Sequence, residues 1–178
     1  MKFLPNRFLK HTTYSHLTRS LLALVCAVAL LSVGPLAAED VNHTEAQVKV
    51  WIPDGWEQEA DDDSLIVGDP NEEVMVAFLV VEGDNVEAAL DAMEAELSEI
   101  VDDVAPDGEA SEIDLNGMPA VVMDAKGSVE GEPVDLGIAV IMTPANKALL
   151  VFAIAQSSAV EKHEKTIEKI LGGIKPLK

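Results

Sequence analysis

The chain has 178 residues, of which 48% are hydrophobic and only 4% aromatic. All 32 of its acidic residues lie after residue 38, so residues 39–178 carry 32 Asp and Glu against eight Lys and Arg, a formal charge of −24. Such a charge excludes nucleic acid and anionic lipid surfaces as partners, because both attract proteins through basic side chains.

Residues 1–38 have the pattern of a secretory signal peptide. Four basic residues precede an apolar run of thirteen residues at 21–33, and Gly34-Pro35 interrupts it before Ala37-Ala38. The pattern predicts cleavage after Ala38 and a secreted or periplasmic protein. A transmembrane anchor is the weaker alternative, because crossing a bilayer takes roughly 20 apolar residues. Lipid attachment at Cys26 is also weaker, because Val25 stands where a small residue is needed.

The rest of the chain is long enough for one compact domain. We expect a flexible lead-in segment over residues 39–46 and a single domain over residues 47–178. The only cysteine of the chain, Cys26, lies in the predicted signal peptide, so no disulfide is expected after cleavage.

The first half of the domain alternates between strand and helix patterns. Strands are predicted at 47–52, 64–68 and 73–81, the first ending at Pro53-Asp54-Gly55. A helix is predicted over 84–104, with Asp84 and Glu87 at capping-box spacing and apolar residues at steps of three and four. Its other face is acidic, and we interpret it as solvated.

The second half is predicted to be an antiparallel meander with a closing helix. Strands at 111–115, 118–128, 133–143 and 148–156 are joined by short turns, including the hairpin signal Asn116-Gly117. Ser158 and Glu161 predict the cap of the last helix, and Gly172-Gly173 its end. The fold class is α+β, an α/β/α sandwich around a mainly antiparallel sheet of about seven strands with two helices.

Several short motifs resemble the PsbP-like superfamily. These are IPDGW at 52–56, GDP at 68–70 and the LNGMPA hairpin at 115–120, together with the order of the elements. The superfamily includes the extrinsic photosystem II protein and small bacterial envelope proteins of the DcrB type. The resemblance implies an α/β/α sandwich and a binding or accessory role, and it implies no set of catalytic residues.

The residues of the domain offer little for catalysis. Its two histidines are His43, in the predicted lead-in, and His163, at the edge of the last helix's apolar stripe, where a half-buried packing role is expected. No serine has the context of a nucleophile elbow, and no glycine-rich loop cradles a phosphate. We therefore predict a protein that is not an enzyme and has no cofactor.

Metal sites are weakly indicated. Zinc is disfavoured because the domain has no cysteine and its two histidines are far apart in sequence. The segment from Glu112 to Gly117 matches half of an EF-hand loop, but Met123 stands where a bidentate carboxylate is required. Asp61-Asp62-Asp63 is better interpreted as a solvated turn, so no metal-ligating residue is predicted.

Two tryptophans flank the turn after the first strand. Trp51 and Trp56 are interpreted as the seal of one end of the sandwich. The alternative is an aromatic platform beside Asp54 and Asp61 that binds a protein or carbohydrate partner.

Two functions remain open. The first is a non-enzymatic accessory protein that recognises an envelope protein through its acidic surface. The alternative is a small-ligand or divalent-cation protein of the calcium type. Solubility in a saline medium also explains the acidity, and the composition does not separate these explanations.

Overall fold

The computed structural model describes residues 38–81 and 86–177. The chain divides into two units, Met1–Pro35 and Leu36–Lys178, and everything below concerns the second unit. The predicted signal peptide lies outside the described residues except for Ala38, and so does Asp84 of the first predicted helix cap. Within the described ranges, no helix is both long and apolar enough to cross a membrane.

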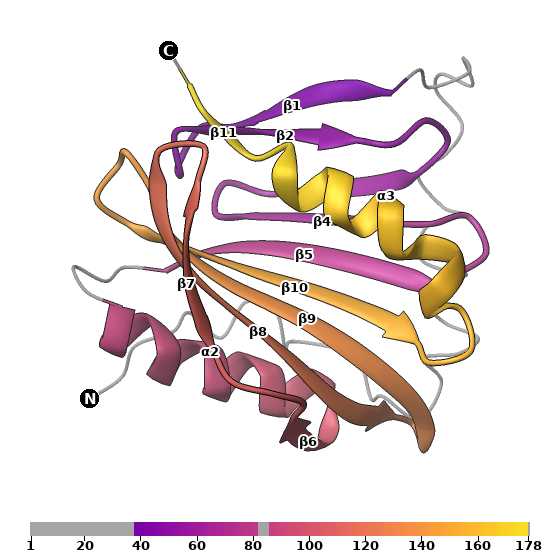
Figure 1. The fold of residues 1–178 in the computed structure, drawn as a ribbon. Coiled ribbons are helices and arrows are strands. Elements are labelled where there is room, and N and C mark those ends of the chain that lie inside the picture. The colour runs from indigo at the N-terminus through magenta and orange to yellow at the C-terminus, as the bar shows by residue number, and fades with distance from the viewer. Residues whose placement is uncertain (1–37, 82–85, 178) are drawn as a thin grey trace. The chain divides into compact units, whose positions relative to one another are not determined.

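A large antiparallel sheet forms the centre of the domain (Figure 1). Its strands, in spatial order, are β3 (Glu57–Ala60), β4 (Ser64–Gly68), β5 (Val74–Val81), β10 (Ala148–Gln156), β9 (Glu132–Met142), β8 (Met118–Val129) and β6 (Asp102–Pro106). A further strand, β7 (Ser111–Leu115), pairs with the first half of β8, whereas β6 pairs with its second half. β6 and β7 therefore follow one another along β8 and together form one edge of the sheet, which we call the β6–β7 edge.

A small second sheet consists of β1 (Glu39–His43), β2 (Val48–Ile52) and β11 (Lys175–Pro176). Glu39–His43 pairs residue by residue with β2, so the flexible lead-in predicted for residues 39–46 differs from the structure over this strand. The sequence EDVNH has one apolar residue and gives no alternation to detect. The strand forms because its backbone pairs with β2, and not because of an alternating pattern of apolar side chains.

Two helices cover opposite faces of the large sheet. α3 (Val160–Gly172) crosses its near face in Figure 1, and α2 (Val86–Ile100) packs on the other face. Successive residues of β10 alternate between the two cores: Leu149 and Val151 face α3, whereas Leu150 and Phe152 face α2. This explains the unbroken apolar runs in the sequence, because a strand covered on both faces needs no polar alternation. The α+β sandwich predicted from the sequence is confirmed.

The ends of the helices differ from the prediction. α2 ends at Ile100 rather than 104, and the following residues form β6, in which Val104 is exposed. Pairing with β8 outweighs the weak helical pattern here. At α3, the residue before the helix is Ala159 and no side chain caps it, so the predicted Ser158 cap is wrong. The predicted end is confirmed, because Gly173 follows the last helical residue.

Candidate functional site

A buried aspartate organises the loop between β4 and β5. Asp69 directly follows β4, and its carboxylate accepts four hydrogen bonds. Oδ1 accepts the backbone N–H groups of Glu73 (2.6 Å) and Val74 (2.9 Å), and Oδ2 accepts the N–H and the side-chain amide of Asn71 (both 3.1 Å). Burial by itself would raise the pKa of Asp69, but these hydrogen bonds outweigh it and hold the pKa below its ordinary value.

Glu73 and His163 meet beside this aspartate. His163 Nε2 lies 2.8 Å from Glu73 Oε2 and 4.0 Å from Asp69 Oδ2. The ammonium group of Lys162 contacts the same Glu73 oxygen. Hydrogen bonds from His163 first and from Lys162 second lower the pKa of the Glu73 carboxyl. The first turn of α3 is thereby fastened to the start of β5.

The ring of His163 is held by packing as well as by charge. His163 lies in the apolar stripe of α3 and is buried, whereas its sequence position predicts a half-buried side chain. The indole of Trp56 packs edge-on against it, with ring centroids 6.4 Å apart and the planes at 73°. The imidazole is therefore fixed between an aromatic ring and two carboxylates. We call Asp69, Glu73 and His163 the His163 cluster.

The His163 cluster is the group of described residues whose ligand atoms could hold a metal ion. One ligand atom from each of its three residues lies within 4.8 Å of the others. However, both oxygens of Asp69 already accept backbone or amide N–H groups, so Asp69 is better suited to order the loop than to ligate. Glu73 and His163 are left as ligands, and Lys162 competes with a cation for the same oxygen. The prediction from sequence missed this grouping.

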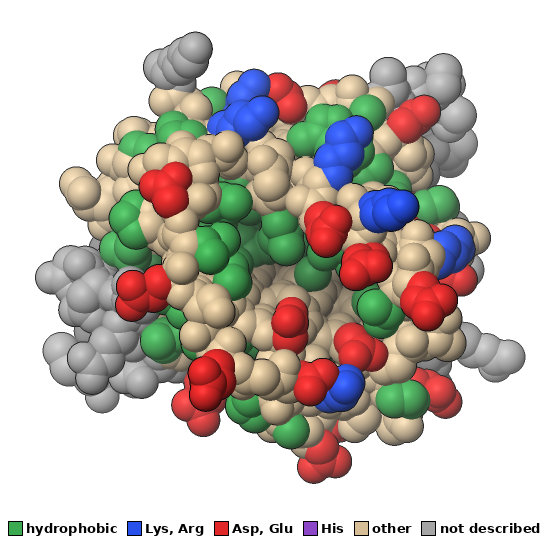
Figure 2. Space-filling view, in the orientation of Figure 1, with side chains coloured by type: hydrophobic (Ala, Val, Ile, Leu, Met, Phe, Trp, Pro, Cys, Tyr) green, Lys and Arg blue, Asp and Glu red, His purple; other side chains and the backbone are tan. Residues whose placement is uncertain are grey.

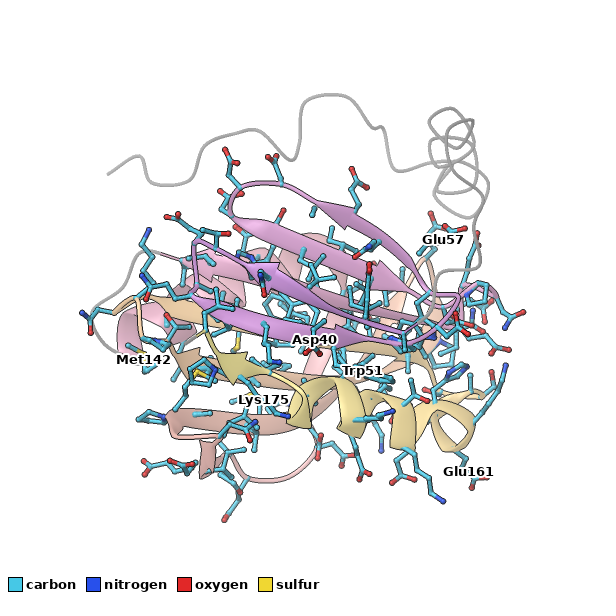
Figure 3. All side chains as sticks on the ribbon, turned by 90° about the horizontal axis from the view of Figure 1, so that it is seen from above. Asp40, Trp51, Glu57, Met142, Glu161 and Lys175 are labelled. Carbon is cyan, nitrogen blue, oxygen red and sulfur yellow. The ribbon has the colours of Figure 1, made fainter. Side chains whose placement is uncertain are left out.

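The four residues predicted from the sequence do not converge on one place. Trp56 is buried in the core, which agrees with the packing role predicted for it. Trp51 belongs to β2 and lies beside α3 (Figure 3), with Lys169 Nζ 3.6 Å from its ring centroid. Asp54 is exposed in the turn before β3, and Asp61 is exposed in the turn after β3. Because β3 separates the two aspartates, they do not form one platform, and a binding role for any of the four residues stays a prediction.

Acidic groups gather on a part of the sheet that α3 does not cover. Figure 2 shows this face hollowed, with acidic side chains on its floor and rim. In the register of β8 and β9, Asp124 pairs with Gly137 and Lys126 with Asp135. These residues alternate in phase with the core residues beneath α3, so their side chains lie on the same face of the sheet. We call this region the acidic face.

The edge beside the acidic face is exposed along its whole length. Every residue from Asp102 to Asp114 is exposed, including the large apolar side chains of Val104 and Ile113. The segment contains six acids and no Lys or Arg. Lys126, on the neighbouring strand, forms an ion pair of 2.7 Å with Asp107. The acidic face and the β6–β7 edge therefore form a continuous negatively charged surface.

Comparison with solved structures identifies the fold. The solution structure of cyanobacterial PsbP (CyanoP) from Synechocystis sp. PCC 6803 superposes with a TM-score of 0.59 at 11% identity, and the match covers 82% of this chain and 97% of that one. The chain has a PsbP-like fold. LpqN, involved in cell envelope biogenesis of Mycobacterium tuberculosis, shares this PsbP-like fold with a TM-score of 0.53 at 16% identity, covering 78% of this chain and 90% of LpqN.

A protein from Bacteroides thetaiotaomicron VPI-5482 also has this arrangement. Its TM-score is 0.53 at 16% identity, and the match covers 80% of this chain and 50% of that protein. No protein-family model matches the sequence, and no curated protein matches it significantly. At these identities the PsbP-like fold is shared while function is not transferred.

One signal in the sequence could have pointed to the His163 cluster. Asp-Pro-Asn at 69–71 between two apolar strands is typical of a loop in which an aspartate binds its own backbone. The contact between Glu73 and His163 spans 90 positions. No spacing rule finds such a pair, because packing of α3 on the sheet brings it together.

Proposed function

We propose that this chain is an exported, non-enzymatic accessory protein that recognises a protein of the cell envelope through its acidic surface. The observation that carries the proposal is the uncovered, negatively charged surface formed by the acidic face and the β6–β7 edge. Export is supported by the basic and apolar leader of the sequence. The PsbP-like fold adds only that a protein of this shape, LpqN, is involved in cell envelope biogenesis.

The chemistry of this surface suits a basic protein partner. Protein interfaces combine apolar contacts with a polar rim, and Val104 and Ile113 supply exposed apolar groups among the acids. Opposite charge on the partner would speed association and favour correct partners, with a strong dependence on ionic strength.

The test is a salt-dependent binding measurement with matched charge variants. Envelope proteins retained by the immobilised protein at low salt would be identified, and the association rate of each would then be measured against ionic strength. The double variant E112Q/D114N on β7 should slow association, whereas E164Q/E168Q, which removes two exposed charges from α3, serves as the control. Equal effects of the two variants would contradict recognition at this surface.

Divalent-cation binding is a second candidate function, favoured by the proximity of Glu73 and His163. Zn²⁺ should raise the melting temperature at matched ionic strength, because a ligand that binds only the folded state stabilises it. The variants E73Q and H163Q should abolish that shift if the His163 cluster is the site. A shift that both variants retain would exclude the His163 cluster.

A further inference from the structure

Two lysines lie directly opposite one another in the small sheet. In the register of β2 and β11, Lys49 pairs with Lys175, so the two side chains project from the same face of the sheet. Like charges in this position destabilise a sheet. Residues 39–178 contain only eight Lys and Arg against 32 acids, and two of these few cations meet where they repel each other. An anion bound between the two ammonium groups would remove this repulsion.

The two ammonium groups are only partly neutralised by the chain itself. Lys49 Nζ lies 2.6 Å from Asp40 Oδ2, and the two side chains are 36% and 49% exposed. Exposed ion pairs of this kind contribute little free energy, so a ligand of higher charge can compete with Asp40 for the lysine. Lys175, labelled with Asp40 in Figure 3, is exposed and forms no ion pair with another described residue. One ammonium group is therefore available outright and the other at low cost.

An open groove adjoins the two lysines. Its volume is about 680 Å³, and it is lined by Lys49, Asn116, Lys175, Pro176 and Leu177. This volume is within the range of sites that bind small molecules. No Asp or Glu is among the lining residues, although acids predominate in residues 39–178. The groove thus combines two cations with the apolar surface of a proline and a leucine.

Asn116 adds a hydrogen-bond acceptor of fixed orientation to the groove. Its Nδ2 donates to the carbonyl oxygens of Gly172 (3.1 Å) and Ile174 (2.7 Å), which uses both hydrogens of the amide. Because both partners are carbonyl oxygens, the amide nitrogen must face them and Oδ1 must face away. No described residue donates a hydrogen bond to Oδ1. A ligand hydroxyl is a neutral donor that suits this oxygen.

We propose that this groove binds a small organic phosphate that also carries a hydroxyl group. The ammonium groups of Lys49 and Lys175 bind the phosphate, and Asn116 Oδ1 accepts the hydroxyl. A phosphate monoester carries a charge of about −1.5 to −2 at pH 7, which matches two ammonium groups better than the single charge of a carboxylate does. This site is separate from the acidic face and from the His163 cluster, and it does not depend on the proposed function.

The test is isothermal titration calorimetry of the purified protein with glycerol 3-phosphate. The ionic strength is held at about 0.15 M, where charges more than about 8 Å away are largely screened. K49Q and K175Q should each weaken binding at least about tenfold. K165Q, which removes the same charge from an exposed position on α3, is the matched control and should leave the affinity within about twofold.

A variant of the opposite sign sharpens the test. D40N frees Lys49 from its ion pair and should tighten binding of glycerol 3-phosphate roughly threefold. D54N, which removes the same charge from an exposed turn, is the control and should have less effect. General electrostatic attraction would respond equally to the two variants.

Three related compounds test the chemistry of the ligand. Methyl phosphate lacks the hydroxyl and should bind about threefold more weakly than glycerol 3-phosphate. Glycerate, which has a carboxylate in place of the phosphate, should bind about tenfold more weakly. Glycerol, which has no charge, should not bind at the same concentrations.

Each part of the proposal has a result that would overturn it. Equal affinities of K49Q, K175Q and K165Q would place the binding outside the groove, and an unchanged affinity in D40N would show that Lys49 does not bind the phosphate. Equal affinities for glycerol 3-phosphate and methyl phosphate would exclude the hydroxyl contact with Asn116. Absence of binding by any of the compounds would overturn the whole proposal. It would leave recognition through the acidic surface untouched, because these measurements involve no protein partner.

Discussion

The two buried histidines of the domain occupy opposite chemical situations. His163 is 7% exposed and His43 is 5% exposed, so burial does not distinguish them. His163 contacts a carboxylate and an indole, whereas both ring nitrogens of His43 lack a partner among the described residues. The polar contacts of His163 therefore stabilise the packing of α3 on the large sheet, whereas the ring of His43 contributes no hydrogen bond to the domain.

This difference predicts opposite consequences when each histidine is replaced. A buried polar group that is fully hydrogen-bonded supports the fold, and removing one partner leaves the other unsatisfied. A buried polar group without a partner costs stability, so replacing it by an apolar side chain of similar shape should cost little. The following predictions test this contrast, beginning with the largest expected effect.

Removing the aspartate that orders the β4–β5 loop should destabilise the domain most. D69A leaves three backbone N–H groups without their acceptor, which should lower the free energy of unfolding by about 2–4 kcal/mol. Chemical denaturation measures this change. D61A, at an exposed aspartate in the turn between β3 and β4, is the control. Its free energy of unfolding should stay within about 0.5 kcal/mol of the wild-type value. Similar losses in both variants would show that Asp69 has no special role.

Replacing each histidine by leucine should give different results. H163L removes the hydrogen bond to Glu73 and the contact with Trp56, and should cost about 1–2 kcal/mol. H43L removes two unsatisfied polar atoms and should be neutral or stabilising by up to about 1 kcal/mol. Both variants would be unfolded by denaturant in the presence of a chelator. A large loss in H43L would mean that ordered water already satisfies the ring.

The pH dependence of stability should distinguish the contribution of His43 from that of Asp69 and Glu73. The pKa of His43 is lowered, so the unfolded chain takes up a proton before the folded domain does, and stability should fall as pH drops below about 6.5. The pKa values of Asp69 and Glu73 are also lowered, so their stabilisation is present above their ordinary pKa values near pH 4 and is lost on further acidification.

Melting temperatures measured from pH 7.5 to pH 3 would check these two ranges. H43Q should remove the decline that begins below about pH 6.5 and keep the acidic one, whereas D69N should weaken only the acidic one. A decline near pH 6.5 that persists in H43Q would assign it to another group.

The smallest effect is expected at the contact that fastens α3 to β2. K169A removes the ammonium group above Trp51 and should cost about 0.5–1 kcal/mol. K165A, at an exposed lysine one turn earlier, is the control and should have less effect. Thermal unfolding measures both. Equal losses would show that helix propensity, rather than the contact with Trp51, accounts for the change.

Much of the fold was predictable because it follows from local patterns. The strands from 64 to 81 and from 111 to 156 were found at nearly their observed bounds, since apolar runs and turn residues such as Asn116-Gly117 act locally. Four strands were not predicted, namely β1, β3, β6 and β11. EDVNH, EQEA and DDVAP have little apolar pattern, and β11 has only two residues. The order of these strands comes from pairing with β2, β4 and β8. Asn116 also exceeded its predicted role, because its side-chain amide donates to carbonyls at the end of α3.

The candidate sites were the least predictable part. Trp56 was correctly expected to pack, but Asp69 and Glu73 were two acids among 32, and their proximity to His163 depends on where α3 docks. His43 was assigned to a flexible segment, so its burial could not be expected.

The amino-acid sequence by itself determined the acidic charge, the leader pattern, the central strands and the sandwich, because charge is additive and hydrophobic periodicity is local. Only the tertiary structure decided which histidine is satisfied and which is not. Hydrogen bonding of a buried side chain depends on residues that lie far away in the chain, and these meet only when the helix and the small sheet pack on the large one.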